Sequence, residues 1–137
     1  MADMADIATM AGNFFRSVWE DVQRKNKIEK EVPPTVRALY EANVSDSEIL
    51  QILNKIWDIP ASEAQHFLKH EKVEAPIREL QYYLETQIGY STEQIQNFIS
   101  QNHVWNKIRA NPKLWSLRRT PEKLFALVQD DKKLEQL

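Results

Sequence analysis

The sequence contains no cysteine, and this absence excludes several kinds of chemistry at once. Disulfide bridges, thiolate metal sites, cysteine nucleophiles and iron–sulfur clusters all need the cysteine sulfur. A chain without cysteine suits a reducing compartment, and residues 1–6 carry two aspartates in place of the basic start of a secretory signal. We therefore expect a cytoplasmic location.

Glycine is almost as scarce, with only two among 137 residues. This scarcity excludes glycine-rich phosphate loops and leaves few residues for the positive-φ turns of β-hairpins. No apolar run approaches the roughly 18 residues that a membrane-spanning helix needs. We therefore expect neither a sheet-rich fold nor a membrane protein.

The long segments between the prolines show apolar residues at the three-to-four spacing of helices. A proline fits the first turn of a helix, where its missing N–H has no partner to lose, so each proline is expected to mark a helix start. The prolines are Pro33, Pro34, Pro60, Pro76, Pro112 and Pro121. The predicted helices cover about 4–27, 34–42, 45–58, 61–71, 75–88 and 91–110, followed by a short helix at Leu114 and Trp115 and a last helix from Pro121.

These segments predict one all-α domain over 1–137, a compact bundle of about seven helices with a helical core at 33–110 and a fraying tail at 130–137. Ser45 with Glu48, and Ser91 with Gln94, have the spacing of capping boxes. Gly89 is suited to the left-handed position that ends a helix, and Thr120 precedes Pro121 as an N-cap.

The first predicted helix, 4–27, has a wide apolar face. Its polar face mixes both signs and its start is acidic, unlike a helix that lies on a membrane surface. The face therefore predicts core packing or self-association as a homodimer. It consists of Ile7, Met10, Ala11, Phe14, Phe15, Val18, Trp19 and Val22.

A weak internal repeat runs through the middle of the chain. The pattern from Val36 to Leu53 recurs from Leu80 to Ile99, with two additional residues at Gly89-Tyr90. A true internal duplication would produce such a match, and so would two unrelated helices that use the same common capping residues. Both interpretations stay open.

Residues 45–71 are expected to form two consecutive helices. Within them, about residues 45–68 resemble a DNA-binding helix-turn-helix, from Ser45-Asp46-Ser47-Glu48 through Ile59-Pro60 to Phe67-Leu68. The segment departs from that motif by about one additional helical turn and by having no glycine at the turn. Its second helix offers a mixed face of Glu63, Gln65, His66, Lys69, His70 and Glu71. Two packed helices without DNA contact are the competing interpretation.

Charge is distributed unevenly. Residues 33–101 hold ten acidic and five basic side chains, whereas 102–123 hold six basic side chains and only Glu122 as an acid. Cations alternate there with aromatic rings able to stack on bases, so the basic, Trp-containing segment 103–123 is the predicted nucleic-acid site. The predicted binding residues are Lys107, Arg109, Lys113, Trp115, Arg118 and Arg119, with Trp105 as a further stacking candidate. Core tryptophans and a solvated cationic face are the alternative.

No other constellation predicts chemistry. His66 and His70 lie four residues apart, but no third ligand accompanies them, so no metal is expected. No nucleophile elbow, carboxylate pair or cofactor fingerprint is present, so we expect no catalytic residue and no cofactor. The sequence predicts a non-enzymatic cytoplasmic regulator that binds nucleic acid. The competing prediction is an adaptor or inhibitor of another protein, including one that itself handles nucleic acid.

Overall fold

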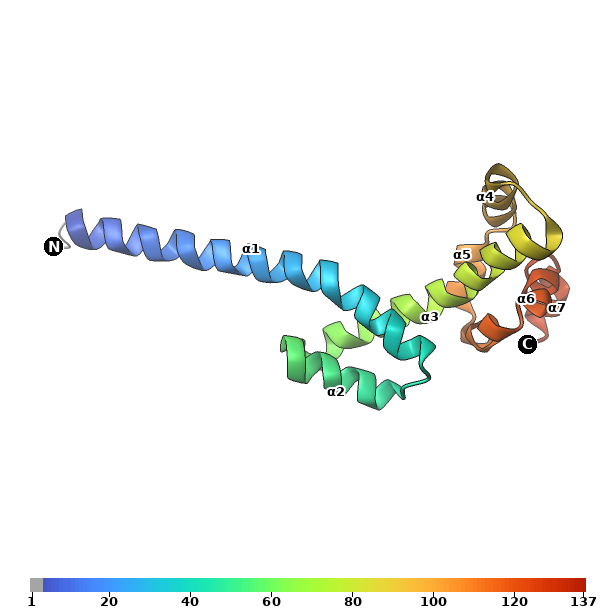
Figure 1. Cartoon of the computed structure of the whole chain (residues 1–137), viewed down its shortest axis with the longest axis horizontal. Helices are drawn as coiled ribbons and strands as arrows, with labels where there is room; N and C mark the ends of the chain where they lie inside the picture. Colours follow the sequence, from blue (N-terminus) through green and yellow to red (C-terminus); the bar gives the residue numbers. More distant parts are fainter. Residues whose placement is uncertain (1–3) are drawn as a thin grey trace. The chain divides into compact units, whose positions relative to one another are not determined.

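The computed structural model describes the backbone of residues 4–137 and the side chains of Thr9 and residues 11–137. These residues form helices and no strand, which confirms the all-α prediction (Figure 1). Among them, no helix is both long enough and apolar enough to cross a bilayer. The elements are α1 (Met4–Glu41), α2 (Asp46–Trp57), α3 (Ala61–Tyr83), a π-helical turn η1 (Leu84–Ile88), α4 (Thr92–Gln101), α5 (Val104–Ala110), a 3-10 helix η2 (Pro112–Arg119), α6 (Pro121–Val128) and α7 (Asp131–Glu135).

The chain forms two compact units, Met1–Phe67 and Leu68–Leu137, and the boundary between them falls inside α3. In the first unit, α2 lies beside the C-terminal part of α1 (Figure 1). The side chains that close this small core are fully buried; most come from the apolar faces of the helices, and Ile59 comes from the connection between α2 and α3. They are Val32, Val36, Ile49, Leu53, Ile59 and Ala64.

The second unit has the larger core, built by the end of α3 and all later elements. Partly buried aromatic side chains, among them Tyr83, Phe98 and Phe125, pack around it. The rings of Phe98 and Phe125 lie 5.2 Å apart between centroids. The buried core residues are Val73, Ile77, Leu80, Leu84, Ile95, Ile99, Val104, Ile108, Leu114, Leu124 and Val128.

The helices predicted at 4–27 and 34–42 are one continuous helix, so the expectation that Pro33 and Pro34 begin a helix is wrong. Both prolines are exposed, so water can reach the carbonyls that lose their N–H partners. The Thr35 hydroxyl donates to the Glu31 carbonyl at 2.9 Å. Val32 and Val36, on either side of the prolines, are buried, and this packing offsets the lost backbone bonds.

The helices predicted at 61–71 and 75–88 are likewise one helix, α3, with Pro76 in its interior. Val73, Ala75 and Ile77 around the proline are all buried, so tertiary packing again overrides a local helix breaker. The helix then widens into the π-helical turn η1 and ends at Gly89, whose φ of 84° is the left-handed conformation predicted for it.

The positions of the other predicted starts agree with the structure, but the predicted caps form only in part. The Ser45 hydroxyl accepts from the Glu48 backbone N–H, which is one half of the predicted capping box, whereas Ser91 and Gln94 form both halves. The Thr120 hydroxyl donates to the Leu117 carbonyl and does not cap α6. Pro112 and Pro121 lie in the first turn of η2 and of α6.

Two later segments differ from the prediction. The helix expected over 91–110 is interrupted at His103, whose left-handed φ of 50° separates α4 from α5. The tail expected to fray at 130–137 contains α7, because the Asp130 side chain caps its first turn and Leu134 packs against the core.

The two halves of the weak repeat adopt the same order of local structures. In each, a left-handed residue stands two positions before the capping serine, and a second left-handed residue follows the capped helix. The two additional residues of the second copy, Gly89-Tyr90, directly follow the π-helical turn η1, which has no counterpart in the first copy. The left-handed residues are Asn43 and Asp58 in the first copy and Gly89 and His103 in the second.

Candidate nucleic-acid interface

The predicted basic segment folds into α5, η2 and the start of α6, and several of its side chains have structural contacts. Lys107 Nζ donates to the Val128 carbonyl oxygen at 2.8 Å and lies 2.9 Å from Asp131 Oδ1. Its side chain is only 21% exposed. Lys107 therefore connects α5 to the C-terminal end of α6, where a helix leaves its last carbonyls unpaired.

Lys113 and Trp115 also bond within the second unit. Lys113 Nζ donates to the carbonyl oxygen of Leu137 at 2.5 Å. The indole N–H of half-buried Trp115 donates to the Ile108 carbonyl at 2.8 Å, near the C-terminal end of α5. A buried indole N–H needs such an acceptor, so Trp115 connects η2 to α5.

The three arginines differ in their environments. Arg109 is exposed on α5, Arg118 is half-buried and Arg119 is exposed, and the latter two have interactions within the chain. The structure thus places all six predicted residues in one folded unit. Their role in nucleic-acid binding stays a prediction.

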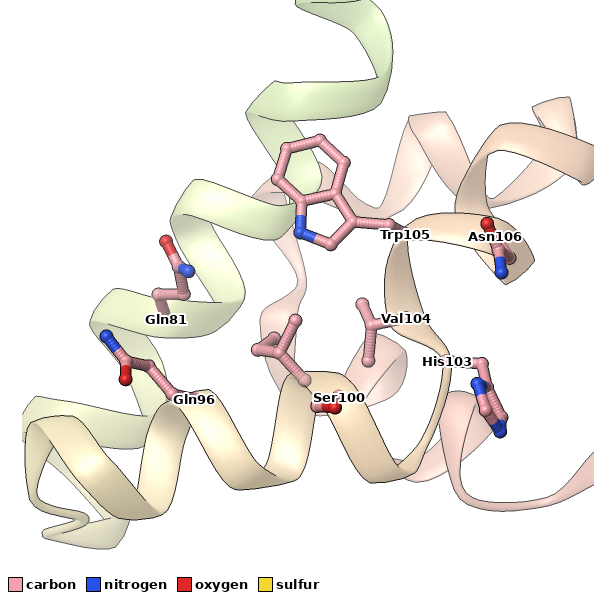
Figure 2. A pocket seen from close by; sticks show the side chains of 8 residues that line it. Gln81, Gln96, Ser100, His103, Val104, Trp105 and Asn106 are labelled. Atoms are coloured by element: carbon pink, nitrogen blue, oxygen red, sulfur yellow. The ribbon is translucent and has the colours of Figure 1, made fainter.

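A pocket of about 420 Å³ opens where this basic segment begins (Figure 2). Gln81 reaches it from α3, Gln96 and Ser100 from α4, and Trp105 and Asn106 from α5. In Figure 2 the amides of Gln81 and Gln96 lie together at one end, and His103 and Asn106 lie at the other. The lining residues are Gln81, Gln96, Ile99, Ser100, His103, Val104, Trp105 and Asn106.

The polar lining is available to a ligand. Within the described part of the chain, the side chains of Gln81, Gln96, Ser100, His103, Trp105 and Asn106 have no hydrogen-bond partner. None of the lining side chains carries a permanent charge. The pocket therefore offers amide, hydroxyl, imidazole and indole groups around an apolar floor of Ile99 and Val104.

The left-handed turn at His103 positions this lining. The Asn102 side chain donates to the Phe98 carbonyl at 3.0 Å at the end of α4, and the chain then reverses into α5. Val104 enters the core with no exposed surface, so the next residue, Trp105, turns half outward to the pocket. Arg109 follows one helical turn after Trp105 on the same side of α5.

Sequence reasoning found Trp105 and His103 as members of the basic segment but missed Gln81 and Gln96. Glutamines are common on helix surfaces, and only the packing of α3 beside α4 brings these two together. The sequence therefore held no local signal for them.

No other cluster suggests a reaction site. Among the residues that the structure describes, no three His, Asp or Glu side chains group as metal ligands. His70 Nε2 lies 3.4 Å from Glu74 Oε2. Glu71, although buried, is paired with Arg78 at 2.7 Å, so it is not an isolated carboxyl of the kind that performs acid–base catalysis.

Comparison with known proteins identifies no relative from which a function of this pocket could be inferred. No protein-family model matches the chain, and searches of curated proteins and of solved structures find no significant similarity.

Proposed function

We propose that this chain is a non-enzymatic cytoplasmic regulator that binds nucleic acid through its second unit and holds an unpaired base in the pocket beside Trp105. The observation that carries the proposal is the set of polar side chains without a hydrogen-bond partner around one pocket at the start of the basic segment.

The chemistry of the lining fits a nucleobase. Glutamine and asparagine amides present a donor and an acceptor side by side, the arrangement that pairs with the edge of adenine. Trp105 packs partly against the core and turns the rest of its indole to the pocket, where a base could stack on it. The volume of about 420 Å³ lies within the range of small-ligand sites. A base inside a duplex cannot enter such a pocket, so the proposal favours single strands.

The phosphates of the strand would meet the cations that follow. Arg109 is exposed one helical turn after Trp105, and its guanidinium can bind a phosphate with two hydrogen bonds. Arg118, Arg119 and Lys123 extend the positive surface along the segment. Lys107, Lys113 and Trp115 support this role because their hydrogen bonds stabilise the second unit. The segment 45–71 that resembles a helix-turn-helix, formed by α2 and the start of α3, is a scaffold or a second contact.

Polarisation titrations with labelled single-stranded and duplex oligonucleotides at two salt concentrations test the proposal. We expect the wild type to prefer single strands and Trp105→Ala to lose about 5- to 150-fold in affinity, the value of one stacked base. Arg109→Ala should lower the salt slope by about 0.7. Tyr82→Ala removes an aromatic ring that is 65% exposed on α3 outside the pocket and is the matched control.

Equal losses for the Trp105 and Tyr82 variants would contradict the pocket and indicate nonspecific ring contacts. A wild type that binds no oligonucleotide would discard nucleic-acid binding altogether.

The second candidate function is an adaptor or inhibitor that binds another protein. The observation in its favour is that Lys107, Lys113 and Trp115 already have partners inside the chain, which leaves fewer groups for phosphate. The acidic excess of residues 33–101 would suit a basic partner, including one that handles nucleic acid. A pull-down that recovers one protein, with no oligonucleotide binding at either salt concentration, supports this candidate over the first.

A further inference from the structure

The N-terminal part of α1 carries an apolar stripe that no described residue of the first unit covers. Phe14, Phe15 and Trp19 are 65%, 70% and 64% exposed, and Val18 and Val22 are 44% and 45% exposed. We name these five residues the α1 stripe. Soluble proteins rarely leave so many large apolar side chains together in water unless they bind something.

The stripe lies N-terminal to the part of α1 that packs against α2. Arg24 donates to the backbone carbonyl oxygens of Trp57 and Asp58, at 3.3 and 3.4 Å, and marks where α2 ends alongside α1. Every described side chain from Ala11 to Lys27 is exposed. In Figure 1 this stretch continues past α2 as a single helix. Between Ala11 and Arg24, α1 therefore presents about three and a half helical turns that no described residue of the first unit packs against.

The spacing of the stripe suits pairing with another helix. Its members follow one another at positions i, i+1, i+4, i+5 and i+8, so they share one face. Ala11 and Val18 also lie seven residues apart on this face, the spacing of helices that wind around each other. Ile7 and Met10 continue the pattern in sequence, although their side chains lie outside the described residues.

We propose that the stripe binds the same stripe of a second copy of this chain, with the two α1 helices antiparallel and crossing near Val18. The area is sufficient for such a pair. An aromatic side chain buries roughly 150–250 Å², so the exposed parts of the three rings amount to on the order of 400 Å² per copy. With the valines, two copies approach the total of about 1,000 Å² that a specific interface requires.

The charges along α1 select the antiparallel orientation. Residues 1–6 contribute Asp3 and Asp6 without a cation, whereas residues 24–30 contribute Arg24, Lys25, Lys27 and Lys30 against Glu29. Asp3 and Asp6 enter by charge and sequence position alone, since their side chains lie outside the described residues. Antiparallel pairing about Val18 brings the start of one α1 helix, where Asp6 lies, level with the basic region of the other. Parallel pairing would bring like charges together.

Sedimentation velocity across a range of protein concentrations tests whether the chain self-associates. We expect a reversible dimer for the full-length wild type and a monomer for Phe15→Glu, because the introduced carboxylate would be buried against apolar side chains. Asn13→Glu adds the same charge on the opposite, exposed side of α1 and should remain dimeric. Because both sites are exposed, neither variant should change the circular dichroism spectrum.

Disulfide trapping tests the orientation and uses the absence of native cysteine. Val18→Cys should form a disulfide-linked dimer, and a mixture of Ala11→Cys and Lys25→Cys should form the mixed dimer. Ala11→Cys alone should remain uncrosslinked, and efficient linkage of this variant would overturn the antiparallel arrangement. A wild type that stays monomeric at every concentration, or a Phe15→Glu variant that dimerises like Asn13→Glu, would overturn the interface. These results do not depend on oligonucleotide binding, so the two proposals can fail separately.

Discussion

Replacing Lys107 by methionine removes the ammonium group that joins α5 to the ends of α6 and α7, while most of the aliphatic stem remains. Two contacts are lost: the hydrogen bond to the Val128 carbonyl at 2.8 Å and the ion pair with Asp131 at 2.9 Å. The sequence predicted that the Lys107 ammonium group binds phosphate. The structure gives it a role in stability that can be measured separately.

The two contacts have unequal value. The Val128 carbonyl loses its charged donor, and an unpaired, partly buried acceptor costs about 1–3 kcal/mol. The Asp131 side chain is 78% exposed, so the ion pair adds less than about 1 kcal/mol. We expect Lys107→Met to lower the free energy of unfolding by about 2 kcal/mol. If the second unit melts as a domain of its own size, its Tm should fall by about 8–16 °C.

Urea denaturation followed by far-UV circular dichroism measures this loss. Arg109→Met is the matched control, since it removes a cation from the same helix at an exposed position and should change stability by less than about 0.5 kcal/mol. Asp131→Asn should cost less than about 1 kcal/mol because only the exposed ion pair is weakened. The reasoning is refuted if Lys107→Met is as stable as Arg109→Met, or if Asp131→Asn accounts for the whole effect.

Three further predictions concern local structure and are checked by the same denaturation measurement. Gly89→Ala should destabilise the protein by about 1–2 kcal/mol, because a side chain at a φ of 84° is strained, whereas Gly12→Ala should stabilise α1 by up to about 1 kcal/mol. Equal effects of the two substitutions would contradict the left-handed conformation of Gly89. Ser91→Ala should cost about 1 kcal/mol through the lost capping box, and a neutral result would show that the cap is dispensable. Leu114→Ala should cost about 2–5 kcal/mol because its side chain has no exposed surface, so a loss below about 1 kcal/mol would argue against η2 as part of the core.

Local signals in the sequence were sufficient for the fold class and for most helix starts. The scarcity of glycine and the helical spacing predicted an all-α chain, and Ser45, Ser91 and Gly89 were read correctly as a helix start, a capping box and a helix end. Each of these features depends on hydrogen bonds or steric limits within a few residues, which any single sequence displays.

The prolines show where local reading fails. Pro33, Pro34 and Pro76 predicted helix starts, yet they lie inside α1 and α3. A proline in a helix costs about 3 kcal/mol relative to alanine, and that cost appears in the local sequence. The burial of Val32, Val36, Val73 and Ile77, which offsets the cost, comes from residues distant along the chain.

The candidate site divides in the same way. Composition alone located the basic segment and its tryptophans, because charge and residue type need no fold to be counted. Only the tertiary structure decided that Lys107, Lys113 and Trp115 bond within the second unit, while Trp105 lines a pocket with Gln81 and Gln96. The physical reason is that a hydrogen-bond partner or a pocket wall is set by the packing of helices far apart in sequence, and neither is encoded in the spacing of neighbouring residues.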